Sequence, residues 1–184
     1  EHMSFNGSKS FPNAEMVTTL EKIGVRFGHE LNAYTSFDET VYYLPIASDK
    51  VQVGLTVLED WAMNLTLAEK EIDRERGVVI EELRLGRNAS TRIREKYLPV
   101  LFDGSLYPYR LPIGKEEVIR DFSYNELRRF YKKWHRPDLM AIIVVGDIDP
   151  QAVEKEIISK FGAYPASKDK SPRPSNPIPD HDNT

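Results

Sequence analysis

The sequence predicts an α+β fold in which a mostly antiparallel sheet is covered by helices. Two observations favour this class. Residues 30–47 are rich in Thr, Tyr, Val and Phe in near alternation, interrupted at Asp38-Glu39, which indicates two strands joined by a tight turn. Several longer segments instead carry apolar residues at helical spacing. Because a hairpin pairs its strands antiparallel, the combination indicates α+β rather than a doubly wound parallel sheet.

The first half of the chain contains helical patterns on both sides of the hairpin. Residues 14–23 place apolar side chains at helical spacing, and Gly24 ends this pattern. Residues 50–65 follow alternating steps of four and three, which is typical of an amphipathic helix buried along one stripe. A highly charged helix is expected over 67–102, with a break near Gly86.

The second half begins with a loop over 103–114, where glycines and prolines are frequent. The next helix, over 123–134, starts at a Ser that is followed three residues later by a Glu, the pattern of a capping box. The apolar run 139–145 is predicted to be a buried strand. A last helix is expected over 150–161, with a proline at its first position.

Residues 1–164 are expected to form one domain, followed by a linker or tail over 165–184. The chain has 184 residues, 40% of them hydrophobic, which is enough for one sizeable core. After Pro165 the composition shifts to Ser, Lys, Asp and Pro, and such a segment is too polar and proline-rich to fold alone.

The composition excludes several classes of function. Lys and Arg number 25 against 29 Asp and Glu, so the net charge of -4 offers no basic footprint for nucleic acid or an anionic membrane. The absence of cysteine excludes disulfides, thiolate metal sites and a cysteine nucleophile. The longest apolar run, 139–145, is far too short to cross a bilayer, and the N-terminus shows no secretory signal pattern. Any metal would therefore need His and carboxylate ligands.

A group of acids on the predicted middle helix is the first candidate site. Glu75 and Glu82 are seven residues apart, two helical turns, so both carboxylates project from one face, and Glu71 adds a third one turn earlier. The plain alternative is a solvated face on which Arg74 and Arg76 relieve the repulsion between the acids.

Glu82 differs from its neighbours because it closes the apolar turn 77–80, whereas Glu81 points elsewhere. A partly buried carboxylate needs a cation or hydrogen-bond donors, so Glu82 is the best metal-ligand candidate of the segment. Glu1-His2, at the start of the chain, carries little information by itself. It is equally well a chance pair or the remnant of a cloning junction.

Four separated blocks together resemble the M16 (pitrilysin, or insulinase-like) zinc metallopeptidases. The first block, Glu-His-Met-Ser-Phe-Asn-Gly-Ser-Lys-Ser-Phe-Pro at 1–12, resembles the sequence around the end of the zinc motif His-x-x-Glu-His. The helix Glu-Arg-x-x-x-x-x-Glu at 75–82 resembles the segment with the third zinc ligand. Residues 32–42 resemble the substrate-side strand and its hairpin partner, and 134–147 a late core strand. The resemblance covers 1 to about 162 and implies an M16 peptidase-like (LuxS/MPP-like metallohydrolase) domain.

Carried over residue by residue, the resemblance makes His2 and Glu82 zinc ligands of one Zn ion. Glu1 becomes the general base that takes a proton from the zinc-activated water, and Glu75 an acid that orients a ligand or its helix. For Glu75, a surface ion pair with an Arg remains the alternative. The resemblance places the first zinc His of the family three residues before Glu1, so the domain is expected to lack its N-terminal strand and one ligand. The 184 residues alone are therefore expected to bind zinc weakly and to be inactive.

The resemblance also implies how a peptide or protein substrate binds. An extended peptide would add to the edge of the strand formed by Asn32, Ala33, Tyr34 and Thr35, although Asn32 could equally be a turn residue. A second M16-like domain, in the same chain or as a partner subunit, would enclose the peptide.

Other aromatic and histidine side chains are left out of the predicted site. Tyr42 and Tyr43 are interpreted as aromatic residues of the core or the sheet face, and His29, His135 and His181 as structural or solvated.

The functional hypothesis is a zinc-dependent endopeptidase domain, and the rival is a non-catalytic M16-like subunit that serves assembly or peptide binding. Because a degenerate subunit has no chemical reason to keep a base and two ligands, Glu1, His2 and Glu82 together argue against the rival. The sequence does not determine the compartment; a bacterial periplasm or cell envelope is the working expectation.

Overall fold

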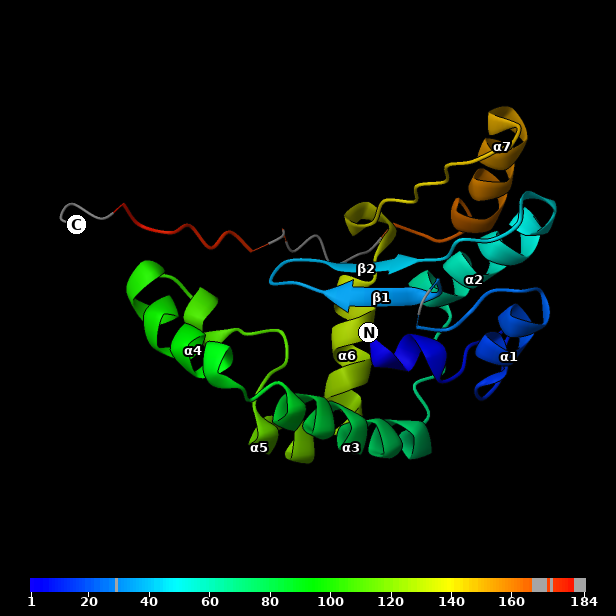
Figure 1. Ribbon diagram of the computed structural model, residues 1–184. Helices are drawn as coiled ribbons and strands as arrows, with labels where there is room; N and C mark the ends of the chain where they lie inside the picture. The colour runs from blue at the N-terminus through cyan, green and yellow to red at the C-terminus, as the bar shows by residue number, and fades with distance from the viewer. Residues whose placement is uncertain (29, 167–171, 173, 181–184) are drawn as a thin grey trace.

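The structure is a computed structural model that describes residues 1–28, 30–166, 172 and 174–180. Helices pack around one antiparallel hairpin, which confirms the predicted α+β class (Figure 1). The strands are β1 (Asn32–Thr35) and β2 (Thr40–Tyr43). The helices of the described residues are α1 (Glu15–Lys22), α2 (Val51–Met63), α3 (Glu69–Leu85), α4 (Ala89–Leu101), α5 (Glu116–Asp121), α6 (Tyr124–Trp134) and α7 (Pro150–Phe161). Short 3-10 turns are η1 (His2–Phe5), η2 (Ser48–Lys50), η3 (Tyr107–Tyr109) and η4 (Pro137–Leu139).

Local signals account for most helix boundaries, and these predictions are confirmed. The long charged segment breaks at Gly86, and the side chain of Asn88 accepts a hydrogen bond from Thr91 N to start α4. Ser123 and Glu126 form the expected capping box at the start of α6. Asp149 caps α7, whose first residue is a proline.

The hairpin turns where the sequence predicted it. Thr35 pairs with Thr40, and Ser36 N donates to Glu39 O at 2.8 Å to close the turn. The tip is held from outside the hairpin, because the Tyr107 hydroxyl donates to Asp38 Oδ2 at 2.8 Å. The hairpin is therefore fixed both by its own ladder and by the loop that follows α4.

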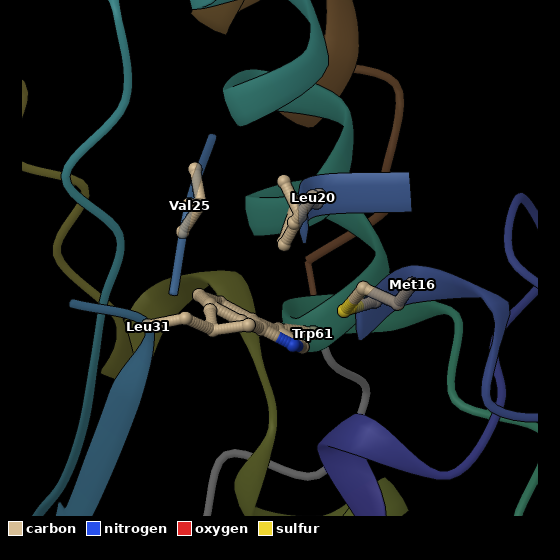
Figure 2. Close-up of a cluster of buried hydrophobic side chains, with 6 residues drawn as sticks. Met16, Leu20, Val25, Leu31 and Trp61 are labelled. Atoms are coloured by element: carbon tan, nitrogen blue, oxygen red, sulfur yellow. The ribbon is translucent and has the colours of Figure 1, made fainter. Parts of the chain in front are cut away.

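The main core lies between α1, α2 and the hairpin, where six apolar side chains are buried (Figure 2). Trp61 of α2 is the largest of them, and its ring stacks on Tyr42 of β2 with 5.3 Å between ring centroids. The stripe predicted from steps of four and three is Val51, Leu55, Leu58, Ala62 and Leu65. Leu55 is buried as predicted, but Trp61, which is also buried, lies outside that stripe. The buried residues of this core are Met16, Leu20, Val25, Leu31, Val57 and Trp61.

The sequence pattern missed α5, a helix of six residues that follows the glycine- and proline-rich loop. Its C-terminal end is held by Arg76 of α3, which donates to the carbonyl groups of Ile119 at 2.6 Å and Phe122 at 2.7 Å. The same guanidinium lies 4.0 Å from the centroid of the Phe122 ring. Because this support comes from another helix, the local sequence carries no signal for it.

The predicted buried strand over 139–145 is wrong. Leu139 ends η4, and the described residues that follow run without strand pairing, as the thin yellow segment before α7 in Figure 1. Ile143 is 79% exposed and Val145 89% exposed. An apolar run becomes a strand only when a neighbouring backbone completes its hydrogen bonds, and β1 and β2 pair with each other.

The described residues of the tail, 165–166, 172 and 174–180, form no helix or strand, and Leu106 N donates to the Asn176 side chain at 3.1 Å. The domain boundary near 164 remains a prediction. His29 and His181 lie outside the described residues. No helix among the described residues combines the length and the apolar character that crossing a bilayer requires.

A buried carboxylate fixes the N-terminal segment to α2. Asp60 is 1% exposed and accepts hydrogen bonds from Ser8 Oγ at 2.6 Å, Ser10 N at 2.8 Å and Ser10 Oγ at 3.2 Å. These bonds satisfy the charge that the helix buries. They also place the residues that follow η1, and through them η1 itself.

Replacing Asp60 with Ala is expected to lower the free energy of unfolding by about 2–4 kcal/mol, because the Ser8 hydroxyl and the Ser10 amide lose their acceptor inside the protein. Urea unfolding followed by circular dichroism measures the change. Asp49→Ala is the matched control, since Asp49 is exposed, pairs with Lys50, and should change stability by less than about 0.5 kcal/mol. Equal unfolding midpoints for the Asp60 variant and wild type would contradict the stabilising role of the Asp60 carboxylate.

Candidate functional site

The N-terminal turn η1 is placed between β1 and α3 (Figure 1). Trp61 Nε1 donates to Ser4 O at 3.1 Å, which ties the turn to α2. On the other side, Met3 packs in a second buried cluster with Leu67 and Ile72 of the α3 region. These contacts hold His2 over the face of α3 that carries the acids.

His2 lies between two carboxylates of α3. Its Nδ1 is 3.0 Å from Glu75 Oε2, and its Nε2 is 3.4 Å from Glu82 Oε2. Glu75 is the more buried partner, with a side chain 16% exposed. The Glu82 side chain is 59% exposed, so the partial burial expected for Glu82 is wrong, and its contact with His2 rather than burial now distinguishes it. Glu75 and Glu82 share a face because they are two turns apart, so both nitrogens of one imidazole meet one stripe of the helix.

The arrangement fits either a ring that carries a proton on both nitrogens or a neutral ring whose Nε2 lone pair binds a metal ion. An ionised carboxylate only accepts hydrogen bonds, so a neutral ring that bonds to Glu75 donates from Nδ1–H and keeps its lone pair on Nε2. That lone pair then faces the negative Glu82 oxygen. Two acceptors 3.4 Å apart repel each other, and a proton or a metal ion between them turns that repulsion into attraction.

The distance between Nε2 and Glu82 fits one metal ion. A tetrahedral zinc held at about 2.0–2.1 Å by each atom would separate the two atoms by about 3.3–3.4 Å, against the observed 3.4 Å. In the part of the chain that the structure describes, no group of three or more His, Asp or Glu side chains could hold a metal ion. His2 and Glu82 thus supply two donors.

Glu1 lies beside His2, and its Oε2 accepts a hydrogen bond from the Thr35 hydroxyl of β1. The structure therefore brings together five residues that the sequence analysis singled out from three distant segments. Their roles remain predictions. These residues are Glu1, His2, Thr35, Glu75 and Glu82.

The arginines on α3 do not neutralise Glu75. Arg74 pairs with Glu71 at 3.0 Å, and Arg76 pairs with Asp73 at 3.2 Å while it holds α5. The neighbouring acid Glu71 is thus engaged in an ordinary ion pair along the helix. Glu75 instead pairs with His2, which distinguishes it from the other acids of this charged face.

The strand β1 carries the residues predicted to bind a peptide. β2 pairs with one of its edges, and among the described residues no strand pairs with the other. Asn32 uses its side chain locally, because Nδ2 donates to Gly28 O at 3.1 Å and Oδ1 accepts from Ala33 N at 2.9 Å. Tyr34 is 48% exposed and donates to Glu39 at 3.3 Å. The backbone edge, rather than the side chain of Asn32, is thus what the strand offers to a ligand.

A cavity of about 100 Å³ lies next to Glu1, with Tyr42, Tyr131 and His135 among its lining residues. Burial lowers the pKa of His135 to about 4 and raises the pKa of Tyr131. Both side chains are therefore neutral near pH 7. Tyr131 and His135 therefore place no charged group beside the carboxylate of Glu1.

Sequence reasoning missed the residues that assemble the site. Asp60, Trp61 and Arg76 contact none of the candidate acids. Asp60 and Trp61 tie the N-terminal segment to α2, and Arg76 holds α5 against α3. The available signal was weak: an acidic and an aromatic residue side by side on a predicted apolar helix. The role of Asp60 becomes visible only once the structure shows that its carboxylate is buried and accepts several hydrogen bonds.

Comparisons with known proteins are consistent with this geometry. Residues 1–99 match the family model of insulinase (peptidase family M16), and residues 121–184 match the model of the peptidase M16 inactive domain. A probable zinc protease, PqqL, of Haemophilus influenzae is 42% identical over 158 residues, which cover 84% of this chain and 17% of the relative.

Solved structures share the fold. The first half of the periplasmic protease PqqL from Escherichia coli matches with a TM-score of 0.88 and 36% identity, over 97% of this chain and 38% of that one. The ferredoxin protease FusC, solved in complex with Arabidopsis ferredoxin, matches with a TM-score of 0.85 and 30% identity, over 96% of this chain and 19% of that one. The chain spans between 17% and 20% of the length of the first three curated relatives.

Proposed function

The chain belongs to the M16 (insulinase) family of peptidases, and from this premise we propose that it carries the zinc-binding part of an endopeptidase that cleaves extended peptides. The single observation that carries the proposal is the imidazole of His2 set between Glu75 and Glu82. A neutral His2 held by Glu75 leaves Nε2 for a metal, and Glu82 supplies the second donor at a suitable separation.

In this proposal Glu1 is the general base. A zinc ion bound at His2 and Glu82 would supply an activated water and polarise the scissile carbonyl. Glu1 is adjacent in sequence to a ligand, so its carboxylate reaches that water without occupying the metal. Glu1 accepts the proton of the attacking water, and Glu75 keeps the imidazole of His2 in the required tautomer and orientation.

The peptide is proposed to add to the free edge of β1, the strand formed by Asn32, Ala33, Tyr34 and Thr35. Backbone hydrogen bonds would then give affinity without strict sequence choice. The FusC relative, solved with a bound ferredoxin, supports a peptide or protein substrate. A second M16-like domain, covalent or in a partner subunit, is proposed to enclose the peptide.

The 184-residue polypeptide by itself is proposed to bind zinc weakly and not to cleave. Catalytic zinc sites use three protein ligands and a water, and His2 and Glu82 are two. The test of function therefore uses the full-length natural chain that contains these residues.

Zinc removal tests the proposal directly. The purified full-length protein should contain about one zinc per site, cleave unstructured peptides detected by mass spectrometry, lose cleavage with 1,10-phenanthroline and regain it with added zinc. A non-cleaving peptide analogue tests binding separately. The rival, a non-catalytic M16-like subunit, predicts peptide binding without zinc-dependent cleavage, and that result would overturn the proposal.

A further inference from the structure

We propose that Thr35 is a positioning residue for the carboxylate of Glu1. The strand that is proposed to bind the peptide would then also orient the general base. The inference rests on the proposed function and deepens it. In this inference the Thr35 hydroxyl orients Glu1, whereas the Thr35 backbone is part of the strand edge proposed to bind the peptide.

The contact between the two residues is specific. Thr35 Oγ1 donates to Glu1 Oε2, and Thr35 is the side chain that donates to this carboxylate among the described residues. The second neighbour of the hydroxyl is Thr40 Oγ1 at 3.3 Å across the hairpin. Because Thr is β-branched, few χ1 values are open to it in a strand, and the direction of its hydroxyl is well defined.

The backbone that carries Thr35 is held from several sides. Thr35 lies opposite Thr40 in the ladder, next to the turn. The tip beyond it is fixed by Tyr107, which donates to Asp38, and by Arg110, whose Nη2 donates to Phe37 O at 3.1 Å. The hydroxyl of Thr35 therefore approaches Glu1 from a rigid support, and a peptide added along β1 would stiffen this support further.

The geometry also assigns the two oxygens of Glu1. Thr35 donates to Oε2 and so lowers the basicity of that oxygen, which leaves Oε1 as the more basic oxygen and the one that takes the proton. When the water O–H bond breaks, the Oε1–H bond forms, and the hydrogen bond from Thr35 to Oε2 is retained. Without the Thr35 hydroxyl the carboxylate would sample other rotamers, and fewer enzyme–substrate complexes would hold it beside the water.

The test uses Thr35→Val, which keeps the branched shape and removes the hydroxyl, in the full-length protein. We expect kcat to fall by about 10- to 100-fold, KM to change by less than about twofold, and the zinc content to stay the same. Thr35→Ser should restore most of kcat because it restores the donor. Thr40→Val is the matched control: Thr40 contacts Thr35 but not Glu1, and this variant should lose less than about threefold.

Each outcome decides the matter. The inference is overturned if Thr35→Val keeps the wild-type kcat, if its defect lies in KM, or if Thr35→Ser does not restore kcat. If Glu1→Gln loses activity but Thr35→Val keeps it, the inference fails and the proposed function stands. An inactive, zinc-free wild-type protein overturns both. If melting shows Thr35→Val to be unfolded, Thr35→Ala replaces it, and its loss of kcat at constant zinc content is read in the same way.

Discussion

Replacing Glu1 with Gln is expected to lower kcat for peptide cleavage by about 10²–10⁴-fold, while the protein keeps its zinc. The amide has the size of the carboxylate and still accepts a hydrogen bond from Thr35, but it cannot take a proton from water. His2 and Glu82, the two donors proposed for the metal, are untouched. Zinc analysis of variant and wild type, together with peptide cleavage, measures both effects.

A second acid provides the control for the Glu1→Gln variant. Glu39→Gln is the control, because Glu39 is an acid of the hairpin that carries Thr35, and its carboxylate contacts Tyr34 and not the imidazole of His2. It should cleave like wild type. Full activity of Glu1→Gln would remove Glu1 from the mechanism, and loss of zinc in this variant would show that Glu1 acts through the metal site.

Replacing Glu82 with Ala is expected to weaken zinc binding by more than about 100-fold and to remove cleavage. Loss of a residue that only orients a ligand already costs about 10–100-fold in affinity, so loss of a ligand should exceed this range. Glu82 is largely exposed, with 59% of its side chain accessible, so the unfolding free energy of the metal-free protein should change by less than about 0.5 kcal/mol. Zinc titration against a chromophoric chelator measures the affinity.

The neighbouring residue gives the matched control for this experiment. Glu81 lies one position away on α3, and its carboxylate pairs with Arg84 at 2.6 Å instead of facing His2. Glu81→Ala should therefore bind zinc and cleave peptides like wild type. Equal zinc affinities for the Glu81 and Glu82 variants would exclude Glu82 as a ligand.

Local signals in the sequence predicted most of the helices and the hairpin. The capping box at Ser123 and Glu126 starts α6, and the break at Gly86 separates α3 from α4. Both signals act within a few residues, so no knowledge of the rest of the fold is needed to use them. The same holds for the turn at Asp38-Glu39.

Predictions failed where the outcome depends on distant residues. The run 139–145 has the composition of a buried strand, but strand formation needs a second backbone, and composition does not show whether one is present. The short helix α5 depends on Arg76, whose guanidinium binds carbonyl groups more than forty residues away along the chain. A charge pattern treats that same arginine as part of a solvated face.

The sequence by itself determined that Glu75 and Glu82 project from one face of a helix, because the helical period is a property of the chain over two turns. The resemblance to the M16 family added the predicted roles of Glu1 and His2 from short blocks of sequence.

Only the tertiary structure decided that His2, 73 residues from Glu75, lies between the two acids. Buried contacts made by Asp60 and Trp61 of α2 place the N-terminal turn there, and the clamped hairpin brings Thr35 to Glu1. Such contacts form only when segments distant in sequence pack together. The spacing of residues along one segment therefore shows which atoms share a face, whereas packing shows what that face meets.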